Sequence, residues 1–262
     1  MADRSVLKAL TILDTLGASD QGMLLSELAN VVGFPMSTTH RLLKTLASQG
    51  YVEKDSFSGR YVLGNKVLFL QIASTNRLKV VRTAFPHLRE LTHAIDEAAN
   101  LSTLSDGRVV YLESVAADRA IGLYSPPGSV APAHCTAMGK VLLSFLAEQE
   151  LNQWFAEHEL AAATPNTITD REILRAQLRQ IRAQGHSIDN EEWVSGIRCI
   201  AAPIHDYSGR VVAAVSVSVP IGRLTADRES SIVIAVKRTC AAISAGMGFR
   251  VEAQRKETAG GR

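Results

Sequence analysis

Apolar residues recur at helical spacing in three successive stretches of the first 50 residues, namely 5–16, 26–33 and 37–50. A stripe of that period can face a core, so each stretch predicts an amphipathic helix. Gly17 and Gly33 suit the left-handed residue that ends a helix, and Ser26 and Ser37 suit its capping start. The apolar faces are predicted to be Val6, Ala9, Leu10, Leu13 and Leu16, then Leu28, Ala29 and Val32, then Leu42, Leu43 and Leu46.

The pattern then changes to alternation, in residues 51–55 and 60–64, around the turn sequence SFSG. Two short strands joined by such a turn form a hairpin. Two short helices separated by the turn GFPM, followed by this hairpin, predict a winged helix-turn-helix.

The polar side of the third helix and the hairpin carry groups that suit DNA. Arg41 has the planar fork that pairs with both acceptors of a guanine, and small hydroxyls at a helix start suit phosphate. Lys54 and Arg60 on the hairpin are expected to contact the DNA backbone. The DNA-binding residues predicted here are Ser37, Thr38, His40, Arg41, Lys44, Lys54 and Arg60. The alternative is a small helical domain with an ordinary solvated face.

Residues 65–98 are helical by pattern, with a long apolar stripe interrupted at Pro86 and at the polar residues 74–76. Such a stripe exceeds what a solitary linker exposes. It lies either on its own second domain or against the same helix of another subunit. A reader of palindromic DNA needs a dimer, so we expect pairing between subunits.

From residue 99 the pattern alternates between strands and helices without regular βαβ units, which indicates an α+β domain with an antiparallel sheet. Strands are expected at 100–105, 108–115, 120–124, 186–193, 198–206 and 210–220, and helices at 134–146, 148–158, 169–184 and 226–249. Thr136 and the pair Thr169 and Glu172 are expected to cap two of the helices. The predicted division is 1–64 for DNA binding, 65–98 as a linker and dimerisation helix, 99–250 as an effector domain, and 251–262 as a disordered tail.

Composition places the chain among globular proteins, with 262 residues, 46% of them hydrophobic. The longest apolar runs are too short for a membrane span, and the start lacks a signal-peptide layout, so we expect a cytoplasmic protein without a membrane partner. Three cysteines without a CxxC pair indicate free thiols. The net charge of +2 is local, because residues 1–77 hold 8 Lys and Arg against 6 Asp and Glu, whereas residues 78–262 hold 20 of each. A local basic surplus is typical of a nucleic-acid site.

The stretch EEWVSGIRCIAAPIH, residues 191–205, raises the question of catalysis. Cys199 as nucleophile and His205 as base would share a strand face but lie about 20 Å apart, which is too far for proton transfer. A metal site of His134, Asp189 and Cys199 stays open, as does the simpler interpretation of Cys199 as a small buried apolar residue. The chain contains no GxGxxG, GxxxxGK or HExxH motif, and no cofactor is expected.

Four segments, RSVLKALTILDTL, SELANVVGFPMSTTHRLLKTLASQGYVEKD, AMGKVLL and GIRCIAAPIHDYSGRVVAAVSVSVP, together resemble the IclR family of bacterial transcriptional regulators. The resemblance implies a winged helix-turn-helix domain, a linker helix and a GAF-like effector domain in a homodimer or homotetramer. It implies operator DNA and a small organic acid as partners, control of a catabolic operon, and repression that ligand relieves.

The same resemblance implies an effector pocket at the start of the AMGKVLL helix, and amides at a helix start together with serine hydroxyls suit a carboxylate. The implied polar contacts are Met138, Gly139, Asp189, Cys199, Ser216 and Ser218, and the implied apolar walls are Ile121, Tyr124, Pro132 and Ile197. Glu191 and Glu192 are expected outside this pocket. Thr39 and Met138 depart from the residues that relatives often carry, so ligand shape is not transferable.

Overall fold

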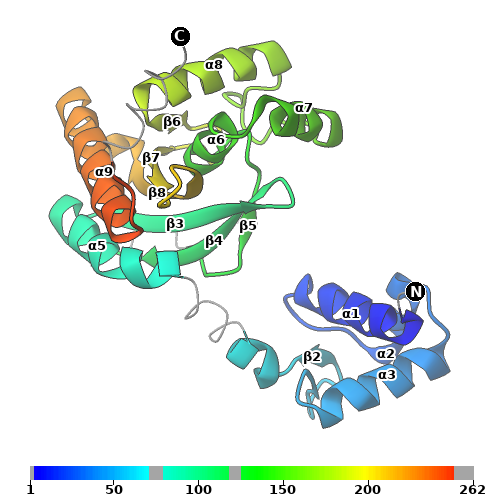
Figure 1. Cartoon of the computed structure of the whole chain (residues 1–262). Helices are drawn as coiled ribbons and strands as arrows, with labels where there is room; N and C mark the ends of the chain where they lie inside the picture. The colour runs from blue at the N-terminus through cyan, green and yellow to red at the C-terminus, as the bar shows by residue number, and fades with distance from the viewer. Residues whose placement is uncertain (1–2, 71–78, 118–124, 251–262) are drawn as a thin grey trace. The chain divides into compact units, whose positions relative to one another are not determined.

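The computed structural model describes residues 3–70, 79–117 and 125–250. It divides into two units, one on each side of the Arg77–Leu78 peptide bond (Figure 1). Within the described residues, no helix has both the length and the apolar character needed to cross a lipid bilayer.

The first unit has three helices and a two-stranded antiparallel hairpin. The helices are α1 (Arg4–Gly17), α2 (Leu25–Val32) and α3 (Met36–Ser48), the strands are β1 (Val52–Lys54) and β2 (Tyr61–Leu63), and residues 65–70 are helical. One buried cluster, formed by Ile12, Leu16, Leu28, Leu42, Leu43, Val52 and Tyr61, joins all three helices to the hairpin. The winged helix-turn-helix predicted from the sequence is therefore confirmed.

The helix boundaries differ from the prediction. Gly17 is still helical in α1, and its φ is not positive. α2 starts at Leu25, where the Glu27 carboxylate accepts from the Leu24 amide at 2.9 Å, so Ser26 is not the cap. α3 starts at Met36 after Pro35, whose ring holds φ near the helical value, and no side chain caps it, so Ser37 is not a cap either. Gly33 does end α2 in the left-handed conformation, with φ 70°.

The apolar face of α1 is also rotated from the expected one. Ile12 and Leu16 are buried, whereas Val6 and Leu10 are more than half exposed. The apolar residues of this helix spread around most of its circumference, so spacing alone did not identify the buried side.

The second unit is a six-stranded antiparallel sheet with helices on both faces, as the α+β prediction required. Its elements are α5 (Lys79–Ile95), β3 (Ala98–Ser105), β4 (Arg108–Val115), β5 (Val130–Ala131), α6 (Ala137–Ser144), α7 (Glu148–Glu157), α8 (Arg171–Gln184), β6 (Ser187–Asn190), β7 (Ile197–His205), β8 (Val211–Pro220), the 3-10 turn η1 (Ile221–Arg223) and α9 (Ala226–Gly246). The strand order is β5-β4-β3-β8-β7-β6.

Two apolar layers lie on opposite faces of this sheet (Figure 1). α5 and α9 bury one face, around Leu88, Val215 and Val236. α6, α7 and α8 bury the other, around Leu143 and Leu178. The central strands β3, β8 and β7 are therefore covered on both sides, which explains their nearly continuous apolar sequences.

α5 lies on its own domain. The stripe that we expected to pair between subunits is buried against the sheet and α9 over Val80, Val81, Ala84, Leu88 and Leu91. Pro86 does not interrupt this helix but lies inside it. The spacing showed correctly that the stripe must be covered, but a pattern along one segment does not say which surface covers it.

The remaining local predictions have mixed outcomes. The Thr136 hydroxyl caps α6 by accepting from the Gly139 amide at 3.2 Å, as expected. α8 is capped by the Asp170 carboxylate, which accepts from the amides of Glu172 and Ile173, and not by Thr169. β5 was not predicted. The strand expected at 120–124 lies outside the described residues.

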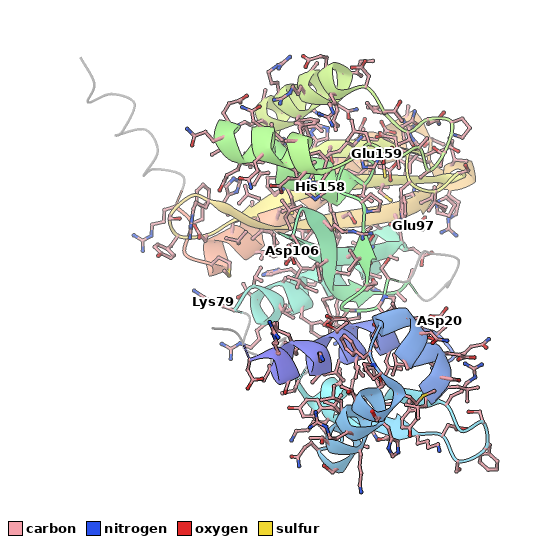
Figure 2. The ribbon with its side chains drawn as sticks, turned by 90° about the vertical axis from the view of Figure 1, so that its right-hand side faces the viewer. Asp20, Lys79, Glu97, Asp106, His158 and Glu159 are labelled. Atoms are coloured by element: carbon pink, nitrogen blue, oxygen red, sulfur yellow. The ribbon has the colours of Figure 1, made fainter. Side chains whose placement is uncertain are left out.

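The β3–β4 hairpin turns through Asp106 and Gly107, which both have positive φ, as the DG sequence predicted. The tip of this hairpin contacts α7, because the Trp154 indole donates to the Gly107 carbonyl at 2.8 Å. The His158 ring stacks on the Trp154 ring. Figure 2 shows Asp106 and His158 at this contact.

Candidate functional site

The outer face of α3 presents most of the side chains predicted to bind DNA. Ser37, His40, Arg41 and Lys44 are exposed, and Thr38 is half-buried. Thr39, between them, is buried, and its hydroxyl donates to the Pro35 carbonyl at 3.2 Å. This departure from the relatives therefore faces the core of the unit.

The hairpin places its two predicted contacts differently. Lys54 is exposed, with its ammonium 5.6 Å from the centre of the Tyr61 ring. The Arg60 guanidinium instead donates to the Glu27 carboxylate and to the Gly22 carbonyl, both at 2.9 Å. The pKa of Glu27 lies below its ordinary value, because its carboxylate accepts from the Leu24 amide and also pairs with Arg60. Arg60 thus connects the hairpin to the start of α2.

A small cavity lies in the second unit between the sheet and the start of α6. Its volume is about 50 Å³. Its walls come from β4, the segment after it, α6, β6, the segment after β6, β7 and β8. The lining residues are Tyr111, Ser125, Thr136, Ala137, Met138, Asp189, Trp193, Cys199, Ser216 and Ser218.

Five of the ten residues predicted for this pocket line it, namely Met138, Asp189, Cys199, Ser216 and Ser218. Ser218 pairs opposite Cys199 in the sheet, and the Cys199 thiol donates to the Ser218 hydroxyl at 3.3 Å. Pro132, Gly139 and Ile197 are not among the lining residues, and Ile121 and Tyr124 lie outside the described residues. Glu191 and Glu192 do not line the cavity, as expected.

Gly139 is needed for packing. A Cβ atom at this position would lie 2.3 Å from the carbonyl oxygen of Ala133, and its amide already donates to the Thr136 hydroxyl. Only glycine therefore allows the start of α6 to approach the preceding loop this closely.

Sequence reasoning missed Tyr111, Ser125, Thr136, Ala137 and Trp193. The alternation along β4 puts Tyr111 on the same sheet face as the buried Val109, which is a usable signal. Trp193 follows β6 in a stretch without regular structure, and nothing in its spacing points inward.

Asp189 is the buried carboxyl of the cavity, with 2% of its surface exposed. Burial raises the pKa of Asp189 to about 7, although its carboxylate accepts from the Glu192 amide at 2.6 Å. Close to neutral pH this side chain can therefore act as a hydrogen-bond donor as well as an acceptor.

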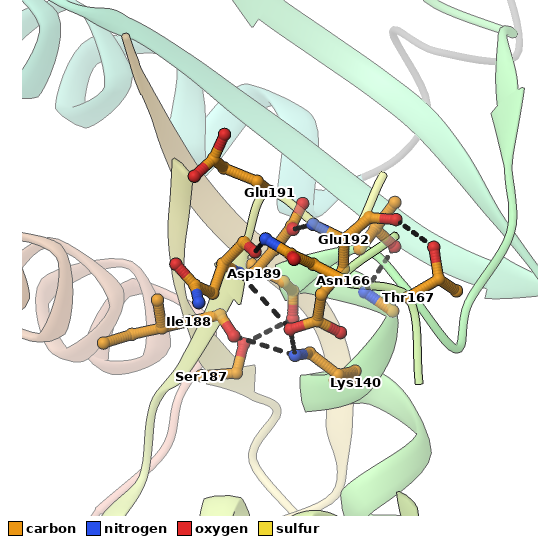
Figure 3. Close-up of polar contacts among 12 residues, drawn as sticks. Lys140, Asn166, Thr167, Ser187, Ile188, Asp189, Glu191 and Glu192 are labelled. Atoms are coloured by element: carbon orange, nitrogen blue, oxygen red, sulfur yellow. Dashed lines mark hydrogen bonds and ion pairs between the residues drawn. The ribbon is translucent and has the colours of Figure 1, made fainter. Parts of the chain in front are cut away.

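A buried ion pair supports the wall that carries Asp189. The Lys140 ammonium donates to a Glu192 carboxylate oxygen and, at 2.8 Å, to the Ile188 carbonyl (Figure 3). Lys140 is completely buried, and Glu192 is 3% exposed. Thr167 reinforces the same segment by donating to the Glu192 carbonyl at 2.6 Å. The Lys140 side chain thus bonds α6 to β6 and to the segment after β6.

The polarity of the cavity suits a small anion or a neutral acid. Among its described lining residues there is no lysine or arginine. The Ala137 and Met138 amides precede the first helical hydrogen bond of α6, which runs from the Lys140 amide to the Thr136 carbonyl. Ser216 is 2% exposed and lines the cavity from β8. These groups converge on one small space.

The thiol at this site is poorly suited to nucleophilic chemistry. Burial raises the pKa of Cys199 to about 12, so it is protonated at neutral pH. His205 lies at the other end of β7, where its ring stacks on Phe249. His134 has its Nε2 2.9 Å from the Ala161 carbonyl oxygen. Within the described part of the chain, no three His, Cys, Asp or Glu side chains are arranged to hold a metal ion.

Two family models match this chain. The IclR helix-turn-helix domain matches residues 5–56, and the C-terminal domain of the bacterial transcriptional regulator IclR matches residues 72–245. The chain is similar to the HTH-type transcriptional regulator BhcR of Paracoccus denitrificans, with 36% identity over 250 residues, which are 95% of this chain and 89% of BhcR.

It is also similar to the HTH-type transcriptional repressor AllR of Escherichia coli, with 34% identity over 243 residues, which are 93% of this chain and 90% of AllR. Among solved structures, the IclR of Thermotoga maritima superposes with a TM-score of 0.75 at 29% identity, covering 94% of this chain and 99% of that one.

Proposed function

Because the chain belongs to the IclR family of bacterial transcriptional regulators, we propose that it represses a catabolic operon and releases the operator when a small organic acid fills the cavity at α6. The chain is a DNA-binding regulator and not an enzyme. The observation that carries the effector proposal is the convergence of the α6 amides, Asp189 and the Ser216 hydroxyl on one buried cavity.

The proposed DNA contacts are of two kinds, contacts to base edges and contacts to the phosphate backbone. Arg41, exposed on α3, reads a guanine, and Ser37, Thr38, His40 and Lys44 position the helix on the phosphates around it. Lys54 holds backbone from the hairpin. Arg60 contributes mainly by fixing that hairpin to α2, because its guanidinium is already bonded to Glu27 and Gly22.

The proposed effector is a small carboxylic acid. The cavity of about 50 Å³ has room for only a few heavy atoms. One carboxylate oxygen would accept from the α6 amides, and Ser216 and Ser218 would bond the rest of the molecule. The Asp189 carboxyl, in its protonated form, would donate to the acid without placing two negative charges side by side.

Coupling between the two units is proposed to be a population shift. A ligand at the start of α6 favours one packing of the sheet, and α5 lies on the other face of that sheet. α5 follows the DNA-binding unit in the chain, so a change in α5 is proposed to alter how two DNA-binding units match their half-sites. This requires a homodimer, or a homotetramer built from two of them.

DNA binding is tested by fluorescence anisotropy with the intergenic DNA beside the protein's own gene and with a shuffled duplex of the same composition. Arg41→Ala should lose preference for the first duplex, whereas Lys54→Ala should weaken both about equally and lower the salt slope by about one. Arg4→Ala, an exposed charge change on α1, is the matched control. Equal affinity of the unaltered protein for both duplexes across salt concentrations would refute operator recognition.

Effector binding is tested by thermal shift with a panel of small carboxylic acids. A ligand at 100 times its Kd stabilises the folded state by about 2.7 kcal/mol, which gives a measurable rise in Tm. Ser216→Ala should reduce this rise, and Ser230→Ala, an exposed serine on α9, should not. Acids that stabilise the Ser216→Ala and Asp189→Ala variants as much as the unaltered chain would place the site elsewhere.

A further inference from the structure

The tip of the β1–β2 hairpin carries an aromatic side chain that no role described above uses. Phe57 is 99% exposed. Burial of a phenylalanine is among the larger apolar contributions available to a small domain, yet this one contributes none within its unit. A single exposed apolar residue is common on protein surfaces, so its meaning depends on how it is held.

The backbone beneath Phe57 is fixed by one carboxylate. Asp55 Oδ1 accepts from the Phe57 amide at 3.0 Å, from the Ser58 amide at 2.6 Å and from the Ser58 hydroxyl at 2.8 Å. These bonds hold the pKa of Asp55 below its usual range. Gly59, with φ 69°, closes the turn. The tip is an ordered turn that projects its aromatic ring into solvent.

The base of the hairpin is anchored as firmly as its tip. Arg60 bonds Glu27 and the Gly22 carbonyl, and Met23 exchanges backbone hydrogen bonds with Tyr61 at 3.0 and 2.7 Å. Because α2 and α3 share one core with this hairpin, the backbone that carries Phe57 is tied to the unit that contains α3. Binding through this residue therefore costs little ordering of the backbone.

DNA is the partner that these surroundings favour. Residues 33–66 carry Arg41, Lys44, Lys54, Arg60 and Lys66 against Glu53 and Asp55, a net charge of +3. Asp55, the acidic residue at the tip, uses its carboxylate to bond its own turn. While a recognition helix occupies the major groove, a chain segment beside it can reach the adjacent minor groove. Apolar side chains that reach a minor groove commonly wedge between base pairs and bend the duplex.

We propose that Phe57 is a wedge that enters the minor groove flanking the site read by α3 and partly unstacks one base step. This inference rests on the DNA-binding function and adds an apolar contact that the polar residues of α3 and the β1–β2 hairpin do not supply. The wedge is expected to favour sites with a flexible pyrimidine–purine step at that place, because such steps unstack most readily.

The test uses the full-length protein and a duplex enriched from a random library by the unaltered chain. One adenine in each flanking minor groove is replaced in turn by 2-aminopurine, whose fluorescence rises when it unstacks. The unaltered protein should raise this fluorescence at one position. Phe57→Ala should abolish the rise and weaken binding by on the order of tenfold, and Phe57→Leu should keep most of both. Ser56→Ala, the exposed neighbour, should change neither.

Three results would overturn the proposal. Phe57→Ala that binds and unstacks the duplex like the unaltered protein shows that the ring is not a wedge, while DNA binding itself stands. If Phe57→Ala alters the oligomeric state in sedimentation and leaves the DNA signal intact, the ring contacts protein instead. If the unaltered chain enriches no duplex, operator recognition fails together with the wedge.

Discussion

The strongest test of the second unit is the replacement of Lys140 by methionine. Lys140 is completely buried, and its ammonium is bonded to the Glu192 carboxylate and the Ile188 carbonyl (Figure 3). Methionine fills nearly the same volume but leaves a buried carboxylate without its cation. Breaking a buried ion pair in this way costs about 3–5 kcal/mol. We expect the free energy of unfolding of this unit to fall by that amount.

The double variant Lys140→Met, Glu192→Leu separates charge from packing. Removing both charges relieves the unpaired carboxylate, and the remaining loss is the donor to the Ile188 carbonyl and the acceptor of the Asn190 amide, about 1–3 kcal/mol for each group left unpaired. The double variant should therefore be more stable than Lys140→Met alone. Lys237→Met is the control, because its exposed ammonium donates only to the Gln184 carbonyl, and a surface change of this kind costs within about 0.5 kcal/mol.

Urea unfolding followed by tryptophan fluorescence reads out this unit alone, because both tryptophans of the chain, Trp154 and Trp193, lie in it. A loss of less than about 1 kcal/mol in Lys140→Met, or a double variant no more stable than the single one, would contradict a tight buried ion pair. Either result would mean that the pair is solvated or readily replaced.

Three further predictions concern single side chains. The pKa of Asp189 is raised to about 7 from an ordinary value of 3.8, so the folded state binds the extra proton and the chain loses stability as pH rises between these values, by up to about 4 kcal/mol. Asp189→Asn should remove this loss in urea titrations at pH 4 to 8; an unchanged pH profile would contradict the burial argument. Gly139→Ala should destabilise the unit by about 1–3 kcal/mol and abolish thermal shifts by acids, whereas Gly222→Ala, with open space around it, should be neutral. Arg60→Met should lower affinity for all DNA without changing the salt slope, and a slope reduced by about one would instead show a phosphate contact.

The periodicity of apolar residues predicted most of the helices and strands, but competition between neighbouring side chains for the free backbone amides decided where two helices begin. The cap position of α2 is Leu24, two residues before Ser26, and that of α8 is Asp170, one residue after Thr169, because the Glu27 and Asp170 carboxylates bond free amides there. Side chains of similar chemistry next to each other make such alternatives nearly equal in energy. The burial of the α5 stripe is a larger difference, because it depends partly on α9, which lies far from α5 in sequence.

The resemblance to the IclR family indicated the five residues that do line the cavity, and some of them are also unusual for their place in the sequence. Ser216 and Ser218 interrupt an apolar strand, and Asp189 is a carboxyl in a strand, so each is unusual in its place. The alternation along β4 indicates the sheet face of Tyr111, but only the sheet register and the path of the 191–196 segment bring Tyr111 and Trp193 to the same space. Register depends on pairing across the whole sheet, and a single sequence does not display it.

Gly139 was predicted to line the pocket with Met138, but neighbouring residues of α6 have different surroundings. All of its residues are buried, so the helix has no solvent side and no amphipathic pattern that separates one role from another. Three successive residues meet three different surroundings: Met138 lines the cavity, Gly139 packs on the Ala133 backbone, and Lys140 bonds Glu192. A rigid helix cannot move one of these without the others. Any shift that a ligand causes at Met138 must therefore be transmitted to the buried ion pair, and the energy of that pair limits how far α6 can move.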